Sequence, residues 1–284
     1  MKILITGATG NIGLSTIKYI RKTALTECEI ILGVRDIERA KKLFNDDTLE
    51  FCVFDFENKE TYTSALKGVE RVFLLRPPHI SDVDKVFVPL LNEAKATGVK
   101  DVVFLSVQGA DKHAFIPHAK IEKVIHRLGF NYIFLRPSYF MQNITSTLKK
   151  DVEEGVIKLP SGLAKFNWID VDDIGRVAAI TLINFSKYKN RVATITGEEN
   201  ISFADAVEIV NSATSGSLKY KSVNLIKFYM HKRQQGVSQA MIMVMIMLHY
   251  LPRFGAEPQI STDFELITGQ KPRTLFEFAK DNMR

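Results

Sequence analysis

The stretch that decides the fold lies at the start of the chain and reads Ile3-Leu-Ile-Thr-Gly7-Ala-Thr-Gly10-Asn-Ile-Gly13. Ile3 to Ile5 is a short, wholly apolar run, which is typical of a strand buried on both faces of a parallel sheet. Beyond Gly13 the apolar residues recur at helical spacing. The glycines therefore lie between a strand and a helix, and in this context they indicate a dinucleotide-binding loop.

Each glycine in this loop has its own physical task. Gly7 lets the chain turn sharply away from the strand, Gly10 lacks the Cβ atom that would keep the backbone away from a pyrophosphate, and Gly13 lets the helix approach the sheet. The helix N-terminus adds free N–H groups and a partial positive charge. The alternative is a tight strand-to-helix turn that binds nothing.

Residues 6–13, Thr-Gly-Ala-Thr-Gly-Asn-Ile-Gly, resemble the signature of the extended and atypical short-chain dehydrogenase/reductases. Within these, the whole chain is most similar to the NmrA-like group. The resemblance implies an α/β fold, a Rossmann-type doubly wound parallel sheet with a smaller, mostly helical C-terminal substrate region. It places an NAD(P)-binding domain at residues 1–150, to which strands return from about 166–200, and the substrate-binding region at 151–284.

Composition limits the functions that are open to the chain. Of its 284 residues, 46% are hydrophobic, enough for a sizeable core, and 25% are charged, as in ordinary soluble proteins. The net charge is +6, from 38 basic and 32 acidic residues, and the basic residues are spread along the chain. This spread argues against direct nucleic-acid binding. The longest apolar run, Ala240 to Leu248, is far shorter than the roughly 20 residues that span a bilayer.

The cellular setting is predicted from the cysteines and the start of the chain. Cys28 and Cys52 have no Cys-x-x-Cys partner, and no signal peptide precedes a fold that begins at residue 2. We therefore expect a reduced, cytoplasmic protein. The histidines show no metal-ligand spacing, so no metal site is expected.

The end of the second predicted strand, Glu29 to Val34, bears on the choice of nicotinamide cofactor. In such folds an acidic residue about 20 positions beyond the glycines holds the ribose of NAD, whereas an arginine accommodates the 2′-phosphate of NADP. Arg35 follows the apolar run first and Asp36 second, and a matching Val-Arg-Asp in the NmrA-like group implies NADP. We therefore expect NADP(H) in preference to NAD(H). Two alternatives stay open: Asp36 turns inward to the ribose, or Arg35 is a solvated charge at a helix start.

Other loops at the same edge of the sheet extend the expected cofactor site, because ligands bind outside the carboxyl ends of parallel strands. The resemblance implies that Asp55 and Phe56, after the strand Glu50 to Phe54, lie beside the adenine. Asp55 is also well placed to cap a helix beginning near Lys59. The stiff loop after the strand Arg71 to Leu75 is expected beside the nicotinamide ribose. The complete set of expected cofactor residues is Gly7, Thr9, Gly10, Asn11, Ile12, Gly13, Arg35, Asp55, Phe56, Leu75, Arg76, Pro77, Ser106, Lys120 and Pro137.

One departure from the usual short-chain dehydrogenase pattern limits the chemistry. Those enzymes use Ser, Tyr and Lys, with Tyr-x-x-x-Lys on a helix, and the tyrosine moves the substrate proton. Ser106 and Lys120 fit the serine and lysine positions, but Ile116 stands where the tyrosine is expected. We therefore expect no alcohol oxidation by the usual route and assign no catalytic residue. His113 and His118 are the nearest titratable substitutes, and a structural role is the alternative for each.

The segment Arg136 to Asn143 resembles the family's Leu-Arg-Pro-x-x-Phe-x-x-Asn motif and is expected to bring aromatic residues over the cofactor. Tyr139, Phe140 and Asn143 are the candidate substrate contacts, with Asn143 as a polar group in an apolar cleft. The alternative is that these aromatics are core residues at helical spacing. The methionine-rich run Met241 to Leu248 is predicted to be a core helix, with a pocket lid or a homodimer face as its alternatives.

Two further helices are predicted from their cap residues. Asp172 or Asp173 is the predicted N-cap of a helix that runs through Val177 to Ile183, and Ser202 is the predicted cap of the next helix. These segments also match the family's C-terminal half, so the resemblance covers nearly the whole chain.

These features lead to one principal expectation and two alternatives. We expect an NADP(H)-binding oxidoreductase that reduces a quinone-like or other electron-poor small acceptor by hydride transfer, since such acceptors need little acid catalysis. A non-catalytic NADP(H)-binding redox sensor or regulator of the NmrA type would share every cofactor residue. A nucleoside-diphosphate-sugar epimerase-like enzyme is the third hypothesis, and Ile116 argues against it. The expected partner is a small-molecule acceptor, not nucleic acid or a membrane.

Overall fold

The structure, a computed structural model, describes residues 1–22 and 28–283. The chain forms two compact units, and both are assembled from segments that are far apart in the sequence. Unit 1 comprises Met1–Pro137, Asp172–Ile195 and Asp263–Gly269, and unit 2 comprises Ser138–Val171, Thr196–Thr262 and Gln270–Arg284.

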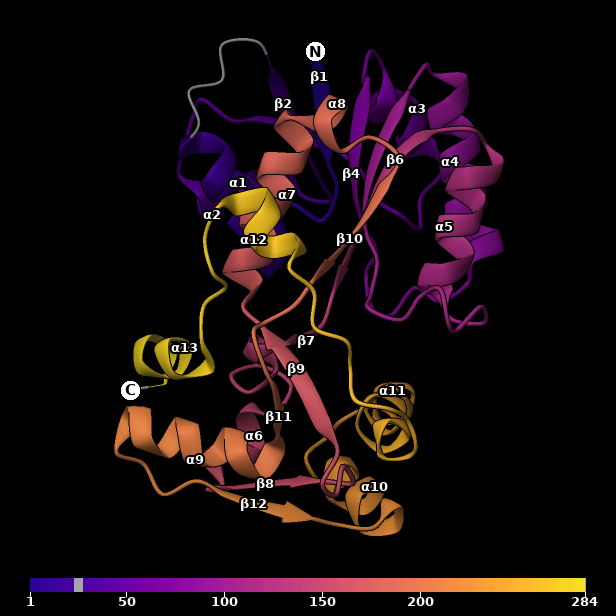
Figure 1. Cartoon of the computed structure of the whole chain (residues 1–284). Helices are drawn as coiled ribbons and strands as arrows, with labels where there is room; N and C mark the ends of the chain where they lie inside the picture. The colour runs from indigo at the N-terminus through magenta and orange to yellow at the C-terminus, as the bar shows by residue number, and fades with distance from the viewer. Residues whose placement is uncertain (23–27, 284) are drawn as a thin grey trace. The chain divides into compact units, whose positions relative to one another are not determined.

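Unit 1 is built around a seven-stranded sheet in the order β10-β6-β5-β4-β1-β2-β3, in which every neighbouring pair is parallel (Figure 1). The strand order reverses at β1, which pairs with β2 on one side and with β4 on the other. This confirms the expected doubly wound, Rossmann-type fold, whose ligand site lies at this point of reversal. Its strands are β1 (Lys2–Ile5), β2 (Glu29–Val34), β3 (Glu50–Val53), β4 (Arg71–Leu75), β5 (Asp101–Leu105), β6 (Asn131–Pro137) and β10 (Arg191–Ile195).

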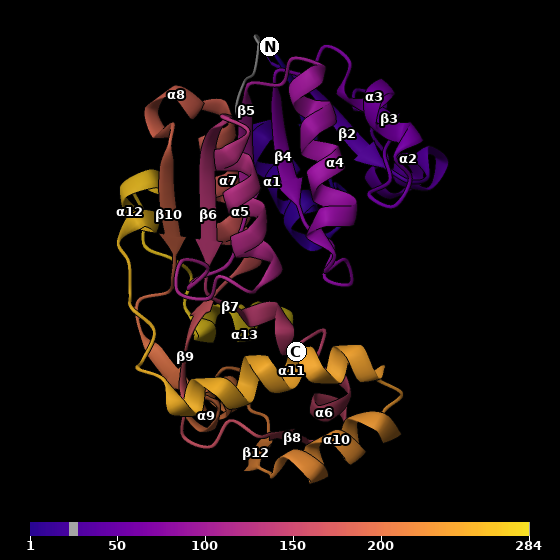
Figure 2. The ribbon, with the colours of Figure 1, turned by 90° about the vertical axis from the view of Figure 1, so that its right-hand side faces the viewer.

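Helices cover both faces of this sheet, with α3, α4 and α5 on one face and α1 and α7 on the other (Figures 1 and 2). Because both faces are covered, the central residues of the inner strands are apolar, and every residue of β4 is buried, including Arg71 at its start. The helices of unit 1 are α1 (Asn11–Lys22), α2 (Ile37–Phe44), α3 (Glu60–Leu66), α4 (Val83–Ala96), α5 (Pro117–Arg127), α7 (Val171–Ile183), α8 (Phe185–Tyr188) and α12 (Asp263–Thr268).

Unit 2 combines two small sheets with helices around an aromatic core. One sheet has the order β11-β9-β7 and the other pairs β12 with β8 in parallel. In the core, the ring centroids of Trp168 and Phe203 lie 5.0 Å apart. The elements are β7 (Tyr139–Phe140), η1 (Met141–Asn143), α6 (Lys149–Glu153), β8 (Val156–Leu159), β9 (Lys165–Ile169), β11 (Asn200–Ser202), α9 (Phe203–Thr214), β12 (Lys219–Ser222), α10 (Leu225–Gln234), α11 (Gln239–Tyr250), η2 (Leu251–Phe254) and α13 (Leu275–Asn282).

Two predicted helix caps are wrong. The Asp55 carboxylate accepts a hydrogen bond from the N–H of Glu57 at 3.0 Å, so it closes a local turn, and α3 begins without a side-chain cap. Helix α7 already begins at Val171, so Asp172 and Asp173 lie inside its first turn rather than before it. Their negative charge still favours the helix N-terminus through the helix dipole. The predicted cap of α9 is confirmed, because Ser202 forms a complete capping box with Asp205.

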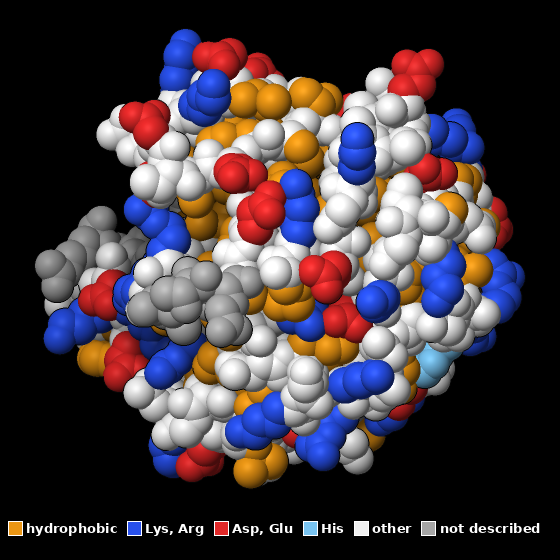
Figure 3. Space-filling view, turned by 90° about the horizontal axis from the view of Figure 1, so that it is seen from above, with side chains coloured by type: hydrophobic (Ala, Val, Ile, Leu, Met, Phe, Trp, Pro, Cys, Tyr) orange, Lys and Arg blue, Asp and Glu red, His pale blue; other side chains and the backbone are white. Residues whose placement is uncertain are grey.

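The surface carries mixed charge where it is drawn. On the face in Figure 3, basic and acidic side chains are interspersed, with no broad patch of one sign. No helix among residues 1–22 and 28–283 is long and apolar enough to cross a membrane.

Candidate functional site

The glycine loop joins β1 to α1 at the carboxyl end of the strand. Gly7 adopts a left-handed conformation with φ of +59°, and Gly13 is so close to the loop that a Cβ atom there would lie 2.5 Å from the Gly7 carbonyl oxygen. Gly10 differs, because a Cβ atom there would meet only that same oxygen, at 3.4 Å, among the described atoms within 4 Å. Thr9, Gly10 and Asn11 are exposed. The backbone around Gly10 therefore borders open space that a side chain would fill.

The N-terminus of α1 adds hydrogen-bond donors to this open space. The first hydrogen bond of the helix runs from the N–H of Leu14 to the carbonyl of Gly10, at 2.8 Å, so the earlier N–H groups have no intrahelical partner. Thr6, directly after β1, links this strand to β4. Its hydroxyl donates to the Phe73 carbonyl and accepts from the Leu75 N–H, both at 2.9 Å. The role of Thr6 was not predicted, although its hydroxyl is the one polar side chain between the apolar run Ile3 to Ile5 and Gly7.

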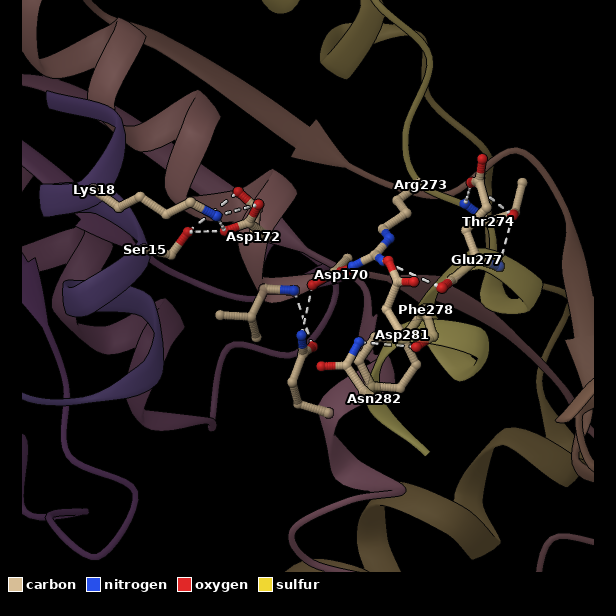
Figure 4. Close-up of polar contacts among 12 residues, drawn as sticks. Ser15, Lys18, Asp170, Asp172, Arg273, Thr274, Glu277, Phe278, Asp281 and Asn282 are labelled. Carbon is tan, nitrogen blue, oxygen red and sulfur yellow. Dashed lines mark hydrogen bonds and ion pairs between the residues drawn. The ribbon is translucent and has the colours of Figure 1, made fainter. Parts of the chain in front are cut away.

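Contacts with α7 hold α1 in position (Figure 4). Asp172 accepts hydrogen bonds from Lys18 at 2.8 Å, Tyr19 at 2.7 Å and Ser15 at 3.0 Å. Burial works in the opposite direction, but these hydrogen bonds hold the pKa of Asp172 below its ordinary value. A Cβ atom at Gly175 would lie 2.2 Å from the Ser15 hydroxyl oxygen, so only glycine fits where α7 meets α1. The contacts with α7 therefore hold α1, and with it the N–H groups at its N-terminus, in place.

Arg35 and Asp36 follow β2, and both are exposed. The Asp36 carboxylate accepts from the N–H of Arg39 at 3.0 Å and caps α2. Among residues 1–22 and 28–283, Arg35 has neither an ion-pair partner nor a side-chain hydrogen bond. The carboxylate is thus engaged with its own helix, and the guanidinium beside it is available to a ligand.

The loop after β4 is organised by Arg76. Its guanidinium donates to the carbonyls of Pro77, Pro78 and Ile80, at 3.1, 3.2 and 2.6 Å, and to Nε2 of His118 at 3.3 Å. Burial, and then the neighbouring Arg76 charge, lower the pKa of His118 to about 3. His118 is therefore neutral at neutral pH and cannot serve there as a charged proton donor.

The residues at the dehydrogenase positions lie after β5 and on α5. Ser106 is 4% exposed, and its hydroxyl has no hydrogen-bond partner in the described part of the chain. A buried hydroxyl without a partner is costly, and a ligand or a water is its usual explanation. Lys120 is exposed and has no counter-ion among the described residues. Ile116 occupies the N-cap position of α5, so its apolar side chain adds no proton donor. His113 is exposed on the loop before it.

The other expected cofactor residues lie at or just after the ends of strands, or in the first turn of α1. Phe56 is only 6% exposed and packs edge-on against Phe54, with ring centroids 4.9 Å apart. Asp55 is half-buried beside it. Pro137 ends β6 and is paired with Ile195 of β10. Leu75 is buried at the end of β4, and Ile12 is half-buried in the first turn of α1.

Two charged residues at this edge had no predicted role. Arg136, at the end of β6, forms two hydrogen bonds with Glu122 of α5, at 3.0 and 2.6 Å, and an ion pair with Asp111 at 3.1 Å. Glu122 is 6% exposed. The pair holds α5, and with it Lys120, against the end of β6. Glu122 lies at an inward position of the amphipathic helix α5, and this position could have predicted a buried ion pair from the sequence.

The first candidate substrate residue, Tyr139, is buried in unit 2. Its ring lies 4.8 Å from that of Trp168, and its hydroxyl lies 2.9 Å from Nε2 of His249. The other ring nitrogen of His249 lies 2.7 Å from the Met245 carbonyl, which can only accept. His249 therefore carries its proton on Nδ1, and the Tyr139 hydroxyl donates to Nε2. This placement favours the core alternative for Tyr139, although in a short strand rather than at helical spacing.

Phe140 and Asn143 are half-buried and flank a polar network in unit 2. Between them, Gln142 donates to the Asp170 carboxylate at 2.5 Å, and Arg273 pairs with the same carboxylate at 3.0 Å (Figure 4). The network fixes the turn that carries Phe140 and Asn143. Their roles as substrate contacts stay predictions.

The edge of unit 1 thus brings donors and cations together, and the nearby acidic groups Asp36 and Glu122 are engaged within the protein. The exposed N–H groups near Gly10, the Arg35 guanidinium, the Ser106 hydroxyl and the Lys120 ammonium all follow or border the carboxyl ends of the parallel strands. The described residues contain no cluster that could hold a metal ion. Such an edge suits an extended ligand that carries phosphates and hydroxyl groups.

Comparison with known proteins places the chain in a family. Residues 1–279 match the model of the NmrA-like family, and the chain belongs to that family. Among curated proteins, it is 29% identical to prestalk A differentiation protein A of Dictyostelium discoideum, covering 99% of this chain and 92% of that protein. It is 26% identical to an NAD(P)H azoreductase of Xenophilus azovorans, covering 98% and 96%.

Solved structures show the same fold. The NADPH-dependent quinone oxidoreductase QOR2 of Escherichia coli, solved with NADPH, has a TM-score of 0.88 and 22% identity, covering 99% of this chain and 100% of that one. NmrA, a negative transcriptional regulator solved with NADP, has a TM-score of 0.71 and 15% identity, covering 99% and 94%. The expected family and fold are therefore confirmed.

Proposed function

We propose that this protein binds NADP(H) and uses it to reduce a quinone-like or other electron-poor small acceptor. The observation that carries the proposal is the edge of unit 1, where open backbone at Gly10 and an unpaired Arg35 follow adjacent strands of the doubly wound sheet. One suits a pyrophosphate and the other a 2′-phosphate. Two structural neighbours solved with NADPH or NADP add support.

Different residues of the chain would bind different parts of the cofactor. Gly10 and the first N–H groups of α1 would hold the pyrophosphate, and Arg35 the 2′-phosphate, for which a planar guanidinium is well suited. Ser106 and Lys120 would bind the nicotinamide ribose and its surroundings, which would give the buried Ser106 hydroxyl its missing partner. Asp55 and Phe56 are proposed beside the adenine. When bound, NADPH supplies a hydride to the acceptor.

The class of acceptor is inferred from what the site lacks. Ile116, at the position of the usual tyrosine, cannot move a proton, and His118 is neutral at neutral pH, so neither residue can act there as a charged acid. Acceptors that take a hydride with little acid catalysis, such as quinones and azo compounds, fit such a site best. The names of the azoreductase and quinone oxidoreductase relatives point the same way. Cytoplasmic location and a homodimer stay predictions.

A redox sensor is the second candidate. A sensor needs the same cofactor contacts and no proton donor, and the neighbour NmrA is a transcriptional regulator solved with NADP. The discriminating property is turnover.

The test measures binding and turnover on the same preparation. NADPH binding is followed by nucleotide fluorescence, and NADPH oxidation is then measured with quinones, azo dyes and activated alkenes. We expect tight binding and oxidation above the uncatalysed rate with at least one class. Gly10→Val is the control: it should abolish both signals and leave the melting temperature nearly unchanged, because its side chain enters open space. Binding without turnover on any acceptor would favour the sensor, and absence of binding would refute both.

A further inference from the structure

We propose that unit 2 carries a second anion site, which binds a small phosphorylated molecule in a hollow formed by β8, β12 and α10. These three elements lie together in unit 2 (Figures 1 and 2). The hollow has a volume of about 430 Å³, within the range of small-molecule sites. Its polar and charged lining includes Lys158, Lys221, Ser222, Asn224, Lys227 and His231. The proposal does not depend on the reductase activity.

The first observation is a like-charge pair across two strands. Lys158 of β8 is in direct register with Lys221 of β12, and both line the hollow. Residues in register on neighbouring parallel strands point to the same face of the sheet, so two lysines there repel each other, with solvent screening part of the repulsion. Lys158 is partly compensated by Glu154, at 3.5 Å, but Lys221 has no counter-ion among the described residues. The strands therefore keep an electrostatic repulsion that any neutral residue at either position would remove.

The second observation concerns the start of α10. Lys227 lies in the first turn of this ten-residue helix, which has no acidic residue there. A cation in the first turn opposes the helix dipole. Asn224 caps the helix by accepting from the N–H of Lys227 at 2.9 Å. The N–H groups of Leu225 and Ile226 remain without intrahelical partners. Lys227 itself has no counter-ion in the described part of the chain.

The acidic groups nearby do not neutralise the hollow. Asp151 is fully buried and is already paired with Lys232, which is also fully buried, and with His231 at 3.1 Å. Glu154 is shared between Lys158, His231 at 3.8 Å and the amide of Gln235 at 2.9 Å. The Lys221 and Lys227 ammonium groups therefore face no carboxylate of their own.

An anion in the hollow would offset both unfavourable arrangements. A phosphate group between Lys158 and Lys221 would replace repulsion by attraction, and it would also suit the start of α10. The Ser222 hydroxyl adds a neutral donor. Local rules of stability are most often broken at functional sites, and here two separate rules are broken around one hollow. The geometry points to a small molecule with a phosphate or diphosphate group.

The experiment uses the full chain and inorganic pyrophosphate as the probe, with ionic strength held constant by sodium chloride. Melting curves and calorimetric titrations are recorded for wild type, Lys221→Gln, Lys227→Gln and the double variant. Lys219→Gln is the matched control, because Lys219 is an exposed lysine on the same strand that does not line the hollow.

We expect opposite signs with and without the anion. Without pyrophosphate, Lys221→Gln and Lys227→Gln should melt at a higher temperature than wild type, because a repulsion is relieved. Each should weaken pyrophosphate binding about threefold or more, the double variant should remove the unit 2 binding isotherm, and the control should behave as wild type. NADPH affinity should not change in any of them, which separates this site from the cofactor site.

Three results would overturn the proposal. Wild-type protein could show no second pyrophosphate isotherm once saturated with NADPH. The double variant could bind pyrophosphate as wild type does, which would place the anion elsewhere. Finally, Lys221→Gln and Lys227→Gln could both melt lower than wild type without the anion, which would make the lysines ordinary stabilising residues.

Discussion

The edge of the sheet in unit 1 and the buried Asp151–Lys232 pair in unit 2 show two opposite arrangements of polar groups. Unit 1 leaves donors without partners at the edge of its sheet, as at Gly10, Arg35 and Ser106. Unit 2 buries an ion pair, Asp151 with Lys232, in which neither residue is exposed. We infer that the unpaired polar groups at the edge of unit 1 serve the proposed ligand, whereas the buried pair in unit 2 joins α6 to α10. Four predictions test this contrast.

The largest expected effect is on the stability of unit 2. Asp151→Ala would leave the Lys232 ammonium buried without its counter-charge, which typically costs about 3–5 kcal/mol. Equilibrium unfolding in urea measures the loss. Replacing both residues, as Asp151→Leu with Lys232→Met, should recover most of it. Glu198→Ala is the control, because it breaks an exposed ion pair with Lys271 that is worth at most about 1 kcal/mol. Equal losses in the two single variants would mean that the buried pair is no more important than a surface pair.

The second prediction concerns acid. His249 is fully buried, and burial lowers its pKa to about 4 in the folded chain, against about 6.5 when unfolded. A depressed pKa gives full stability above about pH 6.5, which is lost as the pH falls towards 4, by about 3 kcal/mol at most. His118, in unit 1, acts in the same direction. Unfolding free energies measured from pH 8 to pH 4 should fall steeply, and His249→Gln should flatten part of that slope. An unchanged slope in the variant would contradict the assignment.

The third prediction returns to the unpaired donors of unit 1. Arg35→Gln should weaken NADPH binding about 10- to 100-fold, the value of a charge-assisted contact to a phosphate, and should leave NADH binding unchanged. Arg39→Gln is the matched control, because Arg39 is an exposed arginine on the helix that follows. Fluorescence titration of both nucleotides gives the affinities. If wild-type protein binds NADH as tightly as NADPH, Arg35 does not select the cofactor.

The same contrast explains what the sequence could reveal. The fold, the glycine loop and the position of Arg35 were predictable, because each depends on residues that are close together in the chain. A strand, a turn and a helix start fit within residues 3–13. The wrong caps show the limit of this local reasoning. The Asp55 carboxylate accepts from the N–H of Glu57, two residues further along, rather than from the start of α3. Helix α7 begins at Val171, one residue before Asp172.

Unit 2 was harder to predict because its contacts join distant segments. Tyr139 donates to a histidine that is 110 residues further along the chain, and Arg273 pairs with a carboxylate 103 residues before it. Neither partner is marked by spacing or motif. The burial of Tyr139, which favours a core role over a substrate contact, could therefore be recognised only from the structure.

The smallest expected effect tests which role Asp36 has beside Arg35. Its carboxylate caps α2 through the N–H of Arg39, so Asp36→Ala should destabilise the protein by about 1 kcal/mol, whereas Asp36→Asn, which retains a good cap, should cost much less. Because the carboxylate is engaged with the helix, neither change should weaken NADH binding. Removing the negative charge beside Arg35 should favour the 2′-phosphate of NADPH slightly. A clear fall in NADH affinity in Asp36→Asn, at unchanged stability, would instead place the carboxylate on the ribose. The preference for NADP(H) would then lose its structural basis, since the acidic residue rather than the arginine would be the group that selects the cofactor.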